Sequence, residues 1–85
     1  MTDELVEQMV VAAVQRAYED WAAEHPSIAA VIDQVTLTEH ATESLRDSPE
    51  YVQAVADYQQ GQSHLTLLEQ FVDLAGPILK RILSS

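Results

Sequence analysis

The chain of 85 residues contains no cysteine and only two glycines and three prolines. Disulfide bonds, thiolate metal sites and cysteine nucleophiles are therefore excluded, and the cross-links that stabilise many small secreted domains are absent. We expect a reducing, cytoplasmic setting. Glycine and proline punctuate the chain at few points, and no internal repeat of about 20–50 residues is present.

The chain also lacks a long apolar run. No stretch of about 18 apolar residues occurs, so the sequence predicts no membrane span. Asp3 and Glu4 stand where a secretory signal peptide would have a positive region, which argues against export by that route.

Cationic side chains are scarce. Four lysines and arginines stand against 14 aspartates and glutamates, which gives a formal net charge of −10. Nucleic acids and anionic membranes both need cationic side chains to replace their counterions. The composition therefore predicts no direct binding to nucleic acid or to an anionic membrane.

The length predicts one domain, residues 1–85. A chain of this size buries only roughly 60–65% of the surface that its unfolded form exposes, so its core is thin. Apolar residues recur at helical spacing, and no alternating strand pattern or hairpin dipeptide is present. The fold class is predicted to be all-α, a compact bundle of four to five helices at residues 3–24, 27–35, 38–47, 49–60 and 64–83.

The first predicted helix ends before Pro26, and its apolar positions share one face: Val6, Val10, Ala13, Val14, Ala17 and Trp21. A second stripe follows at Ile28, Val31, Ile32 and Val35. Its phase slips near residues 35–38, where β-branched residues disfavour a helix. Thr36 and Glu39 fit a capping box there. Residues 27–47 are therefore either one kinked helix or two helices.

Residues 48–50 carry the clearest helix start. Ser48 supplies an N-cap oxygen, Pro49 fits the first helical position, and Glu50 faces the positive end of the helix dipole. The last helix, 64–83, is the most apolar, and we expect it to bend near Gly76-Pro77. Pro77 falls on its polar half and removes the hydrogen bond to the Asp73 carbonyl.

Metal-binding and catalytic signals are weak. Glu39, His40 and Glu43 cluster in sequence, but carboxylate-bridged metal bundles use Glu-x-x-His, and no histidine here has an acid three residues before it. No nucleophile elbow or glycine-rich phosphate loop is present. The sequence therefore predicts no enzyme, no catalytic residue, no metal and no cofactor.

Two clusters of acids break the usual helix rules. Like charges recur every four residues along the third predicted helix, and three acids crowd the negative end of the first helix dipole. A local rule broken without local gain indicates function, although negative charge can also serve solubility alone. The candidate binding face is therefore Glu19, Asp20, Glu24, Glu39, Glu43 and Asp47.

The apolar face of the last helix covers about half of its circumference, which is wider than one thin bundle needs. We expect a homodimer whose candidate seam consists of Leu67, Phe71, Leu74, Ile78 and Ile82.

Three functional hypotheses follow. The first is a small acidic, non-catalytic protein-interaction module that self-associates and binds a basic or mixed protein surface. The second is an inhibitor that mimics nucleic acid by presenting carboxylates to a nucleic-acid-binding protein. The third is a helical carrier domain.

The carrier hypothesis depends on Asp47-Ser48, which resembles the Asp-Ser pair that bears the phosphopantetheine arm in small acidic helical carrier domains. The resemblance implies modification on Ser48. Pro49 stands where those carriers have leucine, and a helix-forming stretch replaces their long loop.

Overall fold

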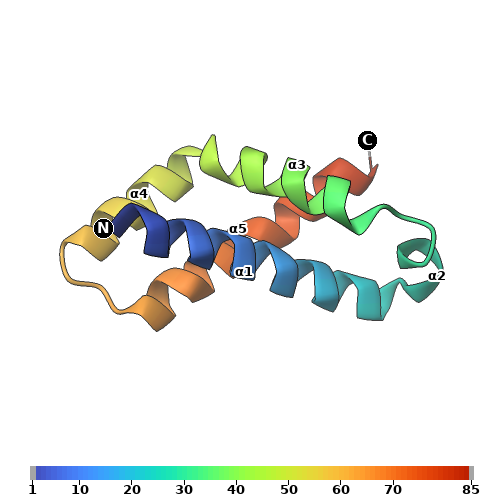
Figure 1. Ribbon diagram of the computed structural model, residues 1–85, viewed down its shortest axis with the longest axis horizontal. Coiled ribbons are helices and arrows are strands. Elements are labelled where there is room, and N and C mark those ends of the chain that lie inside the picture. Colours follow the sequence, from blue (N-terminus) through green and yellow to red (C-terminus); the bar gives the residue numbers. More distant parts are fainter. Residues whose placement is uncertain (1, 85) are drawn as a thin grey trace.

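The protein is an all-α bundle (Figure 1). The computed structural model describes residues 2–84, and the side chains of residues 4–84. Five helices form in this part of the chain: α1 (Thr2–Glu24), α2 (Pro26–Ala29), α3 (Gln34–Arg46), α4 (Pro49–Gln59) and α5 (His64–Ser84). The predicted fold class is confirmed, and helices α1, α4 and α5 lie close to the predicted ranges.

The helices build an elongated bundle of three rods, with principal extents of 42 × 21 × 19 Å. Helices α1 and α5 run in the same direction, and α3 and α4 together run back between their ends (Figure 1). The packing of α1 against α5 is the most extensive contact, α3 contacts both, and α4 packs mainly on α5. The third rod is therefore broken at residues 47–48, and its second half, α4, packs on α5 rather than along α1.

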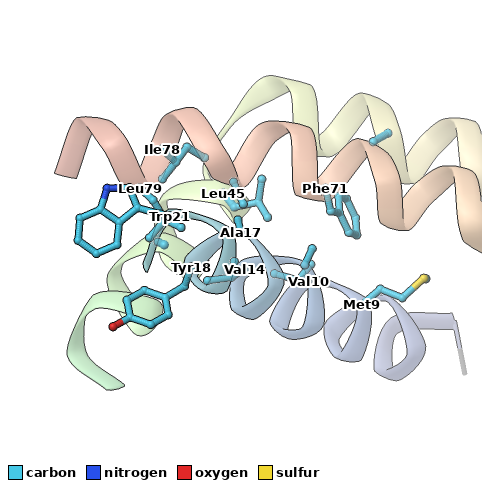
Figure 2. Packing of buried hydrophobic residues seen from close by; sticks show 14 of the residues in the cluster. Met9, Val10, Val14, Ala17, Tyr18, Trp21, Leu45, Phe71, Ile78 and Leu79 are labelled. Carbon is cyan, nitrogen blue, oxygen red and sulfur yellow. The ribbon is translucent and has the colours of Figure 1, made fainter. Parts of the chain in front are cut away.

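The apolar face predicted for α1 is buried in full, together with Met9 and Tyr18. Its residues face Phe71, Ile78 and Leu79 of α5 and Leu45 of α3 (Figure 2). Tyr18 points its hydroxyl away from the core in the same view. The helical periodicity of residues 6–21 therefore predicted six of the buried side chains of α1 and missed Met9 and Tyr18.

Helix α5 supplies the other half of the core. Its buried side chains are Leu67, Phe71, Ala75, Ile78 and Leu79. Phe71 has no exposed surface, and its ring stacks on Tyr51 of α4 at a centroid distance of 5.4 Å. Leu68 and Val72 are half-buried at the edge of the core. Helix α5 is thus the central contact surface of the bundle.

The predicted helix at 27–35 is wrong in its extent. Helix α2 is only four residues long, and α3 begins at Gln34, four residues before the predicted start at 38. Asp33 is the N-cap of α3: its carboxylate accepts hydrogen bonds from the amides of Val35 (3.1 Å) and Thr36 (3.4 Å) and from the Thr36 hydroxyl (2.9 Å).

The break between the two helices therefore lies at residues 30–33, not at the predicted residues 35–38. Aspartate competes for the backbone as an N-cap, and the β-branched Val31 and Ile32 hold a helix weakly at that point. The chain must also reverse direction there to bring α3 back along α1. The predicted stripe is consequently exposed except at Ile32, which is half-buried against the core: Val31 is 84% and Val35 is 64% accessible.

The predicted start of α4 is confirmed. Ser48 has an extended backbone, and its hydroxyl accepts a hydrogen bond from the Tyr51 amide at 3.2 Å, while Pro49 occupies the first turn. Beyond the end of α4, Gly61 has a φ of 113°, a left-handed conformation that glycine adopts without strain. Helix α5 continues through Pro77, which is exposed as expected of its polar half. The bend near Gly76-Pro77 stays a prediction.

The first test concerns the core. Phe71→Ala should lower the free energy of unfolding by about 3–5 kcal/mol, because a fully buried aromatic ring leaves a cavity. Leu65→Ala is the matched control, since Leu65 lies on the same helix and is 71% exposed; its effect should be within about 0.5 kcal/mol. Urea denaturation followed by circular dichroism measures both. Equal midpoints for Phe71→Ala and the parent would contradict this architecture.

The second test concerns the Asp33 cap. The Thr36 side-chain hydrogen bond, followed by the Thr36 and Val35 amides, holds the pKa of Asp33 below its ordinary value of 3.8. A lowered folded-state pKa stabilises the fold above pH 3.8, and this contribution is lost as the pH falls through the lower folded-state pKa. Asp33→Ala should therefore lower the melting temperature at pH 7.

The difference between Asp33→Ala and the parent should stay constant above about pH 5 and shrink below about pH 4. Asp20→Ala is the control, because Asp20 is exposed and makes no hydrogen bond within the described residues. Melting curves recorded from pH 7 to pH 2 measure the difference. A gap that is the same at every pH would show that the charge of Asp33 does not contribute.

Candidate functional site

The acidic surface is the most distinctive chemical feature of the bundle. No described carboxylate side chain is fully buried, and Asp57 alone among them is half-buried rather than exposed. Within residues 4–84 the single ion pair joins Arg46 of α3 to Glu7 of α1. Apart from Glu7, Asp33 and Asp57, the described carboxylates make no side-chain hydrogen bond to described residues. Most of the negative charge is therefore uncompensated within the fold.

One groove lies between α1 and α3. Val11 and Val14 form its apolar part, and Glu39 and Glu43 lie on its α3 side, around a volume of about 300 Å³. Val11 is 53% exposed. Arg46 closes one end through its ion pair with Glu7. This groove already contains a cation with a carboxylate partner.

A second, smaller groove lies between α1 and α5. Asp20 and Glu24 line it together with Trp21 of α1 and Lys80 of α5. Lys80 faces the two acids without forming an ion pair with either. The negative charge at the end of α1 is thus partly balanced by a cation from another helix, which the sequence pattern did not reveal.

A third groove lies between α4 and α5 and was not predicted. It consists of two adjoining hollows of about 310 Å³ and 650 Å³ that share Glu50, Asp73 and Leu74. We call it the α4–α5 groove, and its lining residues are Ser44, Asp47, Ser48, Pro49, Glu50, Gln53, Ala54, Asp57, Gln70, Asp73, Leu74, Pro77, Ile78 and Arg81. The sequence signal that could have found it is the recurrence of acids on α4 and α5 at helical spacing.

The six acids of the candidate binding face do not form one surface. Glu39 and Glu43 line the α1–α3 groove, and Asp20 and Glu24 line the α1–α5 groove. Asp47 lies in the α4–α5 groove, while Glu19 lines none of these three. All six are exposed. The structure distributes the acids over different sides of the bundle, so the candidate binding face is not one continuous surface.

The candidate oligomer seam is largely internal. Leu67 and Phe71 have no exposed surface, Ile78 is 6% exposed, and Leu74 and Ile82 are half-buried. Leu67, Phe71 and Ile78 are buried in the core of their own chain, so they cannot form a seam in this conformation. The exposed apolar side chains are elsewhere, with Val31, Val35 and Ile28 together near the turn between α2 and α3.

Groups with catalytic or metal-binding chemistry do not converge in the described part of the chain. Among residues 4–84, no group of three or more histidines and acids is placed to hold a metal ion. His25 stacks on Trp21 at 5.1 Å, and the Nε2 of His64 lies 2.9 Å from the Tyr58 hydroxyl. Ser48 donates its hydroxyl to the Leu45 carbonyl at 2.8 Å and caps α4, so both of its roles are local.

No family model, curated protein or solved structure matches this chain. Its function must therefore be inferred from its own residues. Within residues 2–84, no helix combines the length and the apolar character that crossing a membrane requires.

Proposed function

We propose that this protein is a small acidic, non-catalytic interaction module that binds a cationic surface of another protein, with the cytoplasm as its setting. The observation that carries the proposal is the uncompensated charge: the described carboxylates are exposed or half-buried, and the single ion pair within residues 4–84 joins Glu7 to Arg46. A field of one sign over a small protein accelerates and orients the approach of a partner of opposite charge.

The three grooves support the same proposal. Each combines carboxylates with apolar side chains, a combination that favours Lys or Arg side chains whose aliphatic stems pack on apolar surface while their charged ends meet the acids. The local hydrogen bonds of Ser48 support a capping role for this residue rather than an attachment site in a carrier domain.

The test is affinity capture with the immobilised protein from a lysate of its native host, with the bound proteins identified by mass spectrometry. The bound set should be enriched in proteins of net positive charge and should elute as the salt rises above roughly 0.1 M, where screening acts within about 10 Å. Bound proteins that are neutral or acidic, or that resist salt, would overturn the proposal.

The same experiment separates the alternative of a nucleic-acid mimic. A mimic binds nucleic-acid-binding proteins at their nucleic-acid sites, so duplex DNA or RNA added as competitor should release the bound proteins. The column of Glu39 and Glu43, one turn apart on the exposed face of α3, is the feature that favours this alternative. Capture that is indifferent to added nucleic acid would exclude it.

The proposal includes self-association. Because most of the predicted seam in α5 is buried, we propose that the exposed apolar residues near the α2–α3 turn form the contact. Val31 and Val35 are the most exposed apolar side chains near the α2–α3 turn, and Ile28 is 49% exposed beside them. Sedimentation at micromolar concentration should show a dimer, and Val31→Ser with Val35→Ser should shift it toward monomer. Val52→Ser, at a 62% exposed position of α4, is the control. A single 9.4 kDa species at high concentration would contradict self-association.

A further inference from the structure

We propose that the α4–α5 groove is the docking site for a cationic amphipathic helix of a partner protein, a helix with an apolar stripe flanked on both edges by Lys or Arg. This inference rests on the proposed function and names the surface and the kind of partner.

The groove has the shape of a helix site. Helices α4 and α5 form a hairpin joined by residues 60–63, and α4 packs mainly on α5, so their outer side is not covered by α1. Ala54 of α4 is 5% exposed in the floor, and its small side chain lets a third helix approach closely. Within α4 the lining extends from Pro49 to Asp57, which along a helix corresponds to roughly 12 Å or two turns.

Each rim carries carboxylates, Arg81 is the one cation among the described residues of the lining and lies on the α5 side, and the floor is apolar. Glu50 and Asp57 lie on the α4 rim, Asp73 lies on the α5 rim, and Leu74 is half-buried between them. Glu50 and Asp73 have no hydrogen-bond or ion-pair partner among the described residues. An occupant that places its apolar stripe on Ala54 and Leu74 would bring cationic residues on both edges against carboxylates.

Gln70 provides a further observation on the α5 rim. Its Oε1 atom is shielded from solvent and has no hydrogen-bond partner in the structure, although Gln70 lines the groove. An occupant can supply a donor to this oxygen after the half-buried Gln70 side chain rotates toward the groove, which would satisfy the unpaired acceptor. Lys and Arg side chains carry only donors, so they match both this oxygen and the neighbouring carboxylates.

A second copy of this chain fits the groove poorly. Its only cationic residues are Arg16, Arg46, Lys80 and Arg81, and each copy carries a formal net charge of −10. No helix of this chain has an apolar stripe with cations along both edges. The α1–α3 groove is a weaker candidate, because its lining has two carboxylates with Arg46, whereas the α4–α5 groove has four carboxylates with Arg81. Charge complementarity therefore selects a cationic helix from another protein.

The test uses a synthetic 14-residue peptide with leucines at helical spacing and lysines on both edges of the leucine stripe. Binding is measured by fluorescence anisotropy at about 0.1 M salt, where exposed charges still interact within about 10 Å. Two comparison peptides accompany it. One has glutamate in place of every lysine, and the other has the same composition in an order that places the leucines on no common face.

The protein variants form a matched pair with the same change in net charge. Glu50→Gln with Asp73→Asn neutralises one acid on each rim, whereas Glu4→Gln with Glu69→Gln neutralises two exposed acids that line none of the grooves described above and lie outside the candidate binding face. The melting temperature of each variant verifies that it is folded.

We expect the lysine peptide to bind and the two comparison peptides to bind at least about tenfold more weakly. The rim variant should weaken binding about five- to tenfold and the control less than about twofold, because the charge contacts are local. In two-dimensional NMR spectra, the amides of Ala54, Gln70 and Leu74 should shift on titration, and those of Val11 and Thr42 should not.

The remaining outcomes overturn the inference in distinguishable ways. Equal weakening in both variants, or shifts centred on Val11 and Thr42, would exclude the α4–α5 groove but leave an acidic interaction module in place. Equal binding of the reordered peptide would exclude a helical occupant. If no peptide binds while the lysate capture retains cationic proteins, the docking proposal fails alone; if the capture also fails, the proposed function fails with it.

Discussion

The packing of α1 against α5 is the interaction on which the rest of this bundle depends. These two helices provide most of the fully buried side chains, including Val10, Val14, Leu67, Phe71 and Leu79. With a chain of 85 residues and no disulfide, this apolar contact must supply most of the stability. The third rod consists of α3 and α4. Helix α3 packs on both α1 and α5, and its buried residues are Leu37, Ala41 and Leu45.

The break between α3 and α4 follows from local chemistry and has a tertiary consequence. Ser48 ends one helix and begins the next, donating to the Leu45 carbonyl and accepting from the Tyr51 amide. Because α4 starts in a new direction, it follows α5 and does not continue along α1. The packing of α4 on α5 leaves a groove between these two helices, with carboxylates on each side. The proposed docking surface is thus a product of one helix cap.

The high negative charge does not disrupt the thin core, because the charged side chains lie on the surface and the described buried residues are all hydrophobic. The described carboxylates remain in contact with water, where salt screens their mutual repulsion. Because none of them is fully buried, the fold avoids the free-energy cost of burying a charge. Like charges on adjacent helices lower the stability only slightly at such exposure. The core can therefore tolerate an acidic surface that a partner with the opposite charge would neutralise on binding.

The sequence by itself determined the helical class, the buried face of α1, the capped start of α4 and the exposure of the acids. Each follows from periodicity, from a capping residue or from the cost of burying charge, which act within one helix. The tertiary structure alone decided the rest. The reversal at residues 30–33 selected Asp33 over Thr36 as the N-cap of α3. The neighbours of each helix distributed five of the six predicted acids over three grooves and buried Leu67, Phe71 and Ile78 of the predicted seam. Helical spacing gives the face of a residue but not what packs against it.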